Sequence, residues 1–233
     1  MEQLRTSYKI SSTLWNSATD PCTWTGVTCI LNTTSQVYHV RNITLNYRGL
    51  IGGVKNVALS QLVQLDLHGN SLSGELPNFS LFPKLQVLDL RNNIMSGPLP
   101  DVSGLPDLQV LNLASNSLTQ TIPNFHYMKK LKVLKLGMNY LAGTLPNFNL
   151  TQLVTLQLSN NNLNGQIPDF NRLPLLQSLE LQSNKFTGPI PVFSNIPSLS
   201  YVNVAGNLFP TTSPTFAPSV GAPTGQPSTQ PTS

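Results

Sequence analysis

Asparagine recurs along this chain at an almost fixed interval of 22 or 23 residues. Leucines precede it in the order L-x-x-L-x-L-x-x-N, as in Leu85, Leu88, Leu90 and Asn93. A pattern repeated at this period predicts one short structural unit that is copied and stacked. The asparagine series consists of Asn70, Asn93, Asn116, Asn139, Asn161, Asn184 and Asn207.

The L-x-L part of each repeat alternates with period two, which predicts a short strand with its leucines facing inward. Such a unit buries its apolar side only against its neighbours, so the strands stack into one parallel sheet. We therefore predict a leucine-rich repeat solenoid, a right-handed arc of the α/β horseshoe type. It should carry about eight short parallel strands on its concave face and a mostly irregular or 3-10 convex side. The units start near residues 40, 62, 85, 108, 131, 153, 176 and 199.

The asparagine series is interpreted as structural. A strand that ends inside a solenoid leaves backbone N–H and C=O groups without partners, and an inward amide has the donors and acceptor that they need. Glycines at a second phase mark a backbone turn, although Gln120 interrupts that series. Phenylalanines at a third phase predict a stacked aromatic spine: Phe79, Phe125, Phe148, Phe170 and Phe193.

Two motifs resemble a known family. The segment N-L-N-G-Q-I-P at residues 162–168 resembles the plant-type extracellular leucine-rich repeat, and W-N-S-A-T-D-P-C-T-W-T-G-V-T-C at residues 15–29 resembles its N-terminal cap. Members include ectodomains of receptor-like kinases, receptor-like proteins and polygalacturonase inhibitors. The resemblance covers roughly residues 15–209. It implies an extracellular module that binds peptides, proteins or glycans, mostly on its concave face. We expect no cofactor.

The two cysteines, Cys22 and Cys29, lie in the cap motif, which we place in residues 1–39. A zinc site would need further cysteine or histidine ligands at suitable spacing, and none lies near. We favour a disulfide, worth roughly 2.5 kcal/mol for so small a loop, and hence an oxidising compartment. The N-x-[ST] pattern gives four glycosylation candidates, Asn32, Asn42, Asn78 and Asn149.

The two ends differ from the repeats at residues 40–209. Residues 1–5 lack the basic and apolar regions of a signal peptide, so with the cap motif we expect a truncated N-terminus. The sequence contains no run of 18 apolar residues, so it predicts no membrane span. Residues 210–233 are rich in Pro, Thr and Ser and contain no charge, which is typical of an extended stalk or linker and resembles linkers in algal and protist surface proteins. A featureless terminus is the alternative.

Only 9% of the residues are charged, and a net charge of +4 gives no argument for nucleic-acid binding. The function should therefore depend on the few side chains that face outward from the concave strands. Asp66, His68, Asp89 and Arg91 should form one patch a few ångströms across. The candidate ligand-binding set is Asp66, His68, Asp89, Arg91, Asn112, Lys135, Gln157, Glu180 and Asn203.

Other functions were weighed against this set. Two carboxylates about 5 Å apart would suit a glycosidase, but on an open, wet sheet nothing would raise a pKa, so we expect no enzyme. Val87, Val110 and Val133 form either an apolar anchor for a partner or ordinary strand residues. A lysine cluster is either a solvated loop or a site for an anionic polysaccharide: Lys129, Lys130, Lys132 and Lys135.

The sequence thus favours a non-enzymatic extracellular recognition module for a protein, peptide or polysaccharide, with no metal and no membrane insertion in this chain. The alternative is a structural adhesin or cell-wall protein, in which the solenoid and stalk serve as a matrix component. An ice-binding solenoid would need flat, regular threonine ladders, and the concave columns are chemically irregular.

Overall fold

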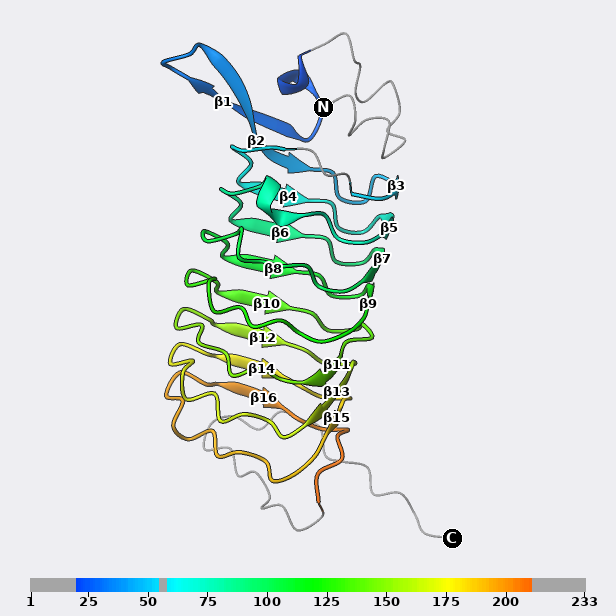
Figure 1. Cartoon of the computed structure of the whole chain (residues 1–233), viewed down its shortest axis with the longest axis vertical. Coiled ribbons are helices and arrows are strands. Elements are labelled where there is room, and N and C mark those ends of the chain that lie inside the picture. Colours follow the sequence, from blue (N-terminus) through cyan, green and yellow to red (C-terminus); the bar gives the residue numbers. More distant parts are fainter. Residues whose placement is uncertain (1–19, 55–57, 211–233) are drawn as a thin grey trace.

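A computed structural model describes residues 20–54 and 58–210 of the chain. The segments at residues 1–19, 55–57 and 211–233 lie outside it, so the predicted start of the cap and most of the Pro/Thr/Ser-rich tail are not described. The described residues form an elongated stack of short strands, with the cap hairpin at one end (Figure 1). Among them, no helix has the length and apolar character needed to cross a bilayer.

The concave sheet has nine strands in the order β1-β2-β4-β6-β8-β10-β12-β14-β16. The eight strands from β2 onward are parallel neighbours, as predicted, whereas β1 pairs antiparallel with β2. Their bounds are β1 Val27–Asn32, β2 Val37–Thr44, β4 Gln64–Asp66, β6 Val87–Asp89, β8 Val110–Asn112, β10 Val133–Lys135, β12 Thr155–Gln157, β14 Ser178–Glu180 and β16 Tyr201–Asn203.

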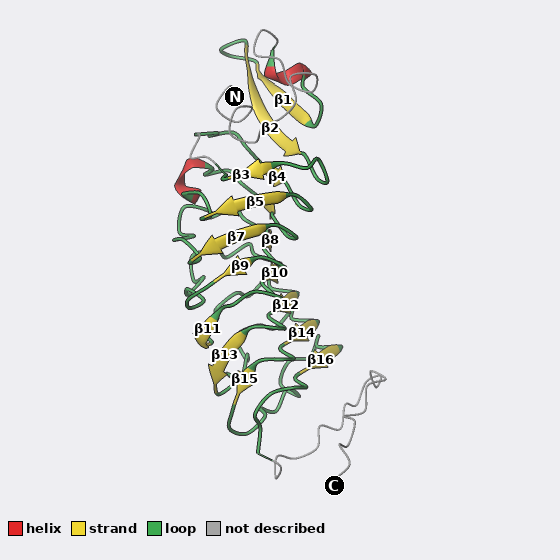
Figure 2. Ribbon diagram, turned by 90° about the vertical axis from the view of Figure 1, so that its right-hand side faces the viewer, coloured by secondary structure: helices red, strands yellow, loops and turns green. Residues whose placement is uncertain are grey.

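A second layer of short strands lies away from the concave sheet (Figure 2). It consists of a four-stranded sheet, β3-β5-β7-β9, and a three-stranded sheet, β11-β13-β15. The convex side, predicted to be mostly irregular or 3-10, therefore also contains short paired strands. The bounds are β3 Ile51–Gly52, β5 Ser71–Gly74, β7 Ile94–Gly97, β9 Ser117–Leu118, β11 Ala142–Thr144, β13 Asn162–Gly165 and β15 Lys185–Phe186, and the two 3-10 turns of the described chain are η1 Pro21–Thr23 and η2 Phe79–Leu81.

One continuous apolar core runs through the stack between these layers. The inward leucines of successive strands, such as Leu88, Leu111 and Leu134, are completely buried. The phenylalanine spine is also buried, and the rings of Phe125 and Phe148 are stacked with centroids 6.2 Å apart. Each repeat therefore completes the core of its neighbours, as a solenoid requires.

The asparagine side chains bind backbone groups of two successive repeats. Asn116 shows the pattern: its Nδ2 donates to the carbonyls of Leu90 and Leu113 at 3.0 and 3.1 Å, and its Oδ1 accepts from the Met95 N–H at 2.9 Å. The amide thus satisfies backbone groups that would otherwise be buried without partners. Equivalent bonds recur at Asn70, Asn93, Asn139, Asn161, Asn184 and Asn207.

The glycine series marks a left-handed backbone position, with φ near 80° at Gly97 and Gly143. Gln120, which interrupts the series in the sequence, keeps the same conformation with φ 67°. At Gly143 an added Cβ would lie 2.8 Å from Cγ2 of Thr121, so glycine is also required there for space. The repeat therefore imposes its backbone conformation even where the residue type is unfavourable.

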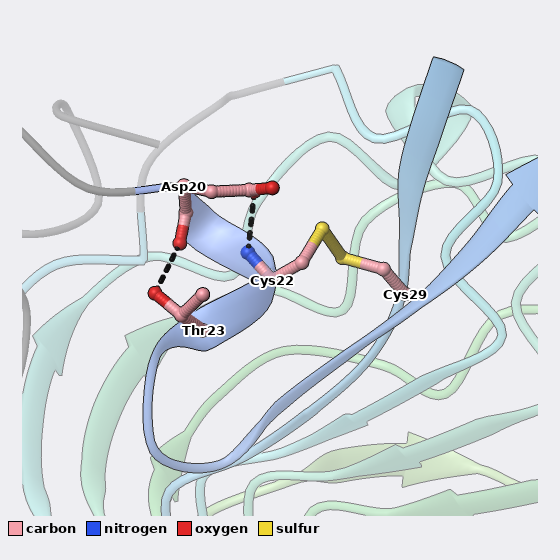
Figure 3. Close-up of a disulfide and its surroundings, with 4 residues drawn as sticks. All are labelled: Asp20, Cys22, Thr23 and Cys29. Carbon is pink, nitrogen blue, oxygen red and sulfur yellow. Dashed lines mark hydrogen bonds between the residues drawn. A yellow bond between two sulfur atoms is a disulfide. The ribbon is translucent and has the colours of Figure 1, made fainter. Parts of the chain in front are cut away.

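The cap is closed by a disulfide between Cys22 and Cys29, with Cα atoms 5.5 Å apart (Figure 3). It ties the η1 turn to strand β1. Asp20 precedes that turn, and its Oδ1 accepts from the backbone N–H of Cys22 at 2.9 Å. Trp24, from the cap motif, is buried with the core. The predicted disulfide is confirmed, and it fastens the hairpin that covers the first repeat.

Candidate functional site

The outward residues of the concave sheet form straight columns because the strands pair without a shift. Asp66 pairs with Asp89, and Asp89 with Asn112. Lys135, Gln157, Glu180 and Asn203 continue this column through β10, β12, β14 and β16. A second outward column lies two residues earlier in each strand. It carries Gln64, Val87, Val110, Val133, Thr155, Ser178 and Tyr201.

At the end nearest the cap, four charged or titratable side chains form one network, the β4–β6 cluster of Asp66, His68, Asp89 and Arg91. Nδ1 of His68 lies 2.6 Å from Oδ1 of Asp66, and Nε2 lies 3.2 Å from Nη2 of Arg91. Arg91 also donates through Nη1 to Asp89 Oδ2. Asn112 adds a donor from the next strand, 3.4 Å from the same oxygen.

Contacts on both sides position the His68 ring. Its Nδ1 faces the Asp66 carboxylate and its Nε2 faces the Arg91 guanidinium. Arg91 therefore lies between the Asp89 carboxylate and the imidazole.

The cluster is less open than the sequence predicted. His68 is 7% exposed and Asp89 is 9% exposed. Burial raises the pKa of Asp89 above its ordinary value, against the lowering effect of the Arg91 backbone N–H and charge. The expectation that nothing on this sheet would raise a carboxyl pKa was wrong for Asp89, because this residue is buried.

Tyr47 contributes to this burial and was missed in the sequence analysis. Its ring meets the His68 ring edge-on, with centroids 4.9 Å apart. Gly69 makes room for it, since a Cβ there would lie 2.4 Å from the tyrosine ring. The sequence signal for this contact was a tyrosine in the degenerate first repeat with a glycine at the equivalent position of the next repeat.

Tyr47 and Gly69 belong to a column in which every residue has a positive φ, between 53° and 68°. This column immediately precedes the asparagine ladder and borders the concave face. Because small polar residues and glycine tolerate this conformation best, Tyr47 and Met138 are its unusual members, and both are exposed. The column comprises Tyr47, Gly69, Asn92, Ser115, Met138, Asn160, Ser183 and Gly206.

The chemistry that the cluster offers is limited by its internal pairing. One ligand atom from each of Asp66, His68 and Asp89 lies within 4.8 Å of the others, a spacing that would suit a metal ion. However, Asp66 already accepts from His68, and Arg91 holds a fixed positive charge against Asp89 and His68. The same bonds occupy the two carboxylates that a glycosidase would need as free acid and base. The arrangement therefore pairs its own polar and charged groups and holds the side chains in place.

The other end of the concave sheet is arranged differently. Lys135 and Glu180 are half-buried, and their side chains form no ion pair or hydrogen bond with another described residue. Val87, Val110 and Val133 lie between the two ends, on β6, β8 and β10, where they are half-buried and stand side by side in register. Gln157 lies between Lys135 and Glu180, and Asn203 follows on the last strand. Asn203 accepts from the backbone N–H of Ala205 at 3.1 Å. The predicted ligand-binding set thus divides into the self-paired residues near β4 and β6 and the side chains of Lys135, Gln157 and Glu180, which bind no other described residue.

The remaining candidates lie away from this surface or at its edge. Lys130 is exposed and pairs with Asp107 at 2.6 Å, so the lysine cluster is not a uniform patch of free charge. Among the glycosylation candidates, Asn32 and Asn78 are exposed, whereas Asn149 is half-buried. Asn42 is half-buried within β2, between partner strands β1 and β4.

Comparisons with known proteins agree with this architecture. The family described as Leucine rich repeat N-terminal domain matches residues 7–30. The family described as Leucine Rich Repeat matches residues 61–80, 84–105, 107–127 and 152–172. Receptor-like protein 3 of Arabidopsis thaliana is 38% identical over 74 residues, which are 31% of this chain and 9% of that protein.

Two solved structures are similar over larger parts of the chain. One is the ectodomain of the plant membrane receptor kinase GASSHO1/SCHENGEN3 from Arabidopsis thaliana, in complex with CASPARIAN STRIP INTEGRITY FACTOR 2. It is 28% identical with a TM-score of 0.70, covering 86% of this chain and 28% of that one. The other is the plant peptide hormone receptor RGFR1 in complex with RGF2, 33% identical with a TM-score of 0.65, covering 68% and 27%.

The chain spans less than a third of the length of each of these relatives. Within that span, the fold of this chain is similar to that of the two solved structures. Together with the family matches, this similarity supports a plant-type extracellular leucine-rich repeat protein.

Proposed function

We propose that this chain is a non-enzymatic extracellular recognition module that binds a peptide or protein on its concave sheet. The observation that carries the proposal is the register of Val87, Val110 and Val133. These side chains form a half-buried apolar strip at the centre of the sheet, beside polar and charged side chains in the adjacent column. An apolar centre with polar groups beside it is the usual composition of a protein-binding surface.

The relatives support the same class of ligand. One similar structure is a peptide hormone receptor in complex with RGF2. The disulfide supports an oxidising, extracellular environment for this chain. The irregular chemistry of the concave columns supports selective recognition. An enzyme would need free acid and base groups, and the β4–β6 cluster does not offer them.

A phage-displayed library of random dodecapeptides, selected on the folded protein, tests this proposal. The peptides that it enriches should lose about tenfold or more in affinity for Val110→Arg, because that change places a charge in the apolar strip. Val192→Arg is the matched control: Val192 is 69% exposed and lies outside the concave strands. A library that yields no binder, or binders that tolerate Val110→Arg, would contradict the proposal.

A glycan is the second class of ligand for the same surface, favoured by the amide-rich column of Asn112, Gln157 and Asn203.

The alternative function, a structural adhesin or cell-wall protein, is favoured by the uncharged Pro/Thr/Ser-rich sequence at residues 210–233. It predicts retention of the protein on purified cell-wall polysaccharide by both the wild type and Val110→Arg. A recognition module acting through the apolar strip predicts no such shared retention.

A further inference from the structure

Lys135 in β10 and Glu180 in β14 stand on the concave sheet without a partner in the described chain. Both residues are half-buried, and neither side chain forms a hydrogen bond or ion pair with another described residue. The β4–β6 cluster shows how the same sheet pairs charges within the fold. Two charges that the described residues leave unpaired are therefore available to a partner outside the described chain.

The neighbours of these two residues extend the same surface. Gln157 lies directly between them, because it pairs with Lys135 on one side and Glu180 on the other. We call Lys135, Gln157 and Glu180 the β10–β14 row.

The row has a definite order of charge and spacing. A cation stands at one end, an anion at the other and an amide between them. Two strand spacings of about 4.8 Å separate Lys135 from Glu180, so the two charges act about 10 Å apart. An anionic polysaccharide would be attracted at Lys135 but repelled at Glu180, and a neutral glycan would leave both charges unpaired.

We propose that the β10–β14 row binds a peptide segment that carries opposite charges about 10 Å apart. Its carboxylate pairs with Lys135, and its ammonium or guanidinium pairs with Glu180. This inference rests on the proposed recognition function. Residues 210–233 do not supply this partner, because they carry no charge.

The spacing also selects a peptide conformation. In a polyproline II helix, residues i and i+3 lie on the same side and are about 9 Å apart. In a β-strand, the residues on one side are about 7 or 14 Å apart, which fits the row less well. The best match is therefore an extended, proline-rich segment with an acidic residue and a basic residue three positions apart, in either direction.

Three fluorescein-labelled peptides test the inference directly. Each has a centre flanked by alanine and serine: Glu-Pro-Pro-Lys, Lys-Pro-Pro-Lys or Glu-Pro-Pro-Glu. Fluorescence anisotropy at low salt should show that Glu-Pro-Pro-Lys binds about tenfold tighter than either like-charged peptide, since each of the latter places one charge against a like charge. Equal affinities, or no charge-dependent binding up to millimolar peptide, would overturn the inference.

Charge reversal in the protein sharpens the test. Lys135→Glu should shift the preference to Lys-Pro-Pro-Lys, and Glu180→Lys should shift it to Glu-Pro-Pro-Glu. Lys132→Glu is the matched control, because Lys132 is exposed and outside the row, and it should leave the ranking unchanged. Circular dichroism and urea unfolding verify that each variant is folded. An unchanged ranking in both row variants would place the recognition elsewhere.

The two proposals fail in different ways. If library-selected peptides lose affinity for Val110→Arg but bind Lys135→Glu and Glu180→Lys normally, the recognition function stands, but the β10–β14 row does not bind the charges of the peptide. If they are insensitive to all three changes, the concave sheet is not the binding surface.

Discussion

The two ends of the concave sheet place charged side chains at equivalent positions but treat them differently. On β4 and β6, Asp66 and Asp89 are bound by His68 and Arg91. On β10 and β14, Lys135 and Glu180 have no such partners in the described chain. The backbone register is the same in both places. Position on the sheet therefore decides where a charge points, while its neighbours decide whether it is available to a ligand.

This difference separates stability from recognition on one surface. A cluster that satisfies its own charges is rigid and should contribute to folding. A charge without a partner contributes little to folding, because nothing in the fold depends on it. Substitutions at the two ends should consequently differ in their effect on the free energy of unfolding, provided that the solenoid beneath them is equally stable.

The largest expected effect tests whether the solenoid is equally stable beneath the two ends of the sheet. Asn93 lies beneath the β4–β6 cluster and Asn161 lies closer to the β10–β14 row, and each binds the same three kinds of backbone group. Asn93→Ala and Asn161→Ala should each cost about 3 kcal/mol, because buried backbone groups lose their partners. Urea unfolding measures both values, with the exposed Asn164→Ala as a control near zero. Costs that differ by more than about 1 kcal/mol would mean that the two ends of the solenoid are not comparable.

Arg91 gives the second largest effect. Arg91→Met should destabilise the fold by about 2 kcal/mol, because it leaves the buried Asp89 carboxylate without its cation. The value is below that of a fully buried pair, since the Arg91 side chain is 38% exposed. Arg172→Met makes the same change at an exposed arginine and should be nearly neutral. If the two variants unfold at the same urea concentration, the cluster does not stabilise the protein.

The fold could be predicted from the sequence because it depends on residues that recur. The leucines, the asparagine series and the phenylalanine spine each repeat at one phase, so one interpretation accounts for all of them. The second layer of strands was not predicted, since segments such as Ser71–Gly74 are short and contain glycine, a typical turn residue. Gln120 likewise gave no sign that it would keep the glycine conformation, which the neighbouring repeats impose.

The columns of the candidate site were also predictable, because side chains alternate along a strand with period two. The pairing within them was not. The bond between His68 and Arg91 depends on rotamers of residues 23 positions apart. The contact between Tyr47 and His68 depends on Gly69 leaving space, which no periodicity reveals. Burial of Asp89 follows from such contacts and therefore appears only in three dimensions.

The raised pKa of Asp89 predicts a smaller, pH-dependent effect. Its pKa is raised by burial in the folded state, so between its ordinary value and the raised value the folded protein binds more protons than the unfolded one. The contribution of Asp89 to stability should therefore fall as pH rises through this window and recover as pH falls. In urea unfolding, the stability of the wild type minus that of Asp89→Asn should decrease as pH increases from about 3.8.

Other carboxyl groups cancel in this difference. Asp101 is an example, because hydrogen bonds from the Ser103 side chain and backbone lower its pKa, and it is present in both proteins. A difference that rises with pH would mean that the Arg91 charge outweighs burial at Asp89. The β4–β6 cluster would then be a simple ion-pair network.

The smallest effect is expected at the other end of the sheet. Lys135→Met and Glu180→Gln should each change the free energy of unfolding by less than about 0.5 kcal/mol, because neither side chain has a partner in the described chain to lose. Lys135→Met makes the better comparison with Arg91→Met, since both replace a cation on the same face by methionine. A cost near that of Arg91→Met would show that Lys135 holds the fold together, and its charge would then no longer indicate a ligand. A near-zero cost together with altered peptide preference would assign stability to one end of the sheet and recognition to the other.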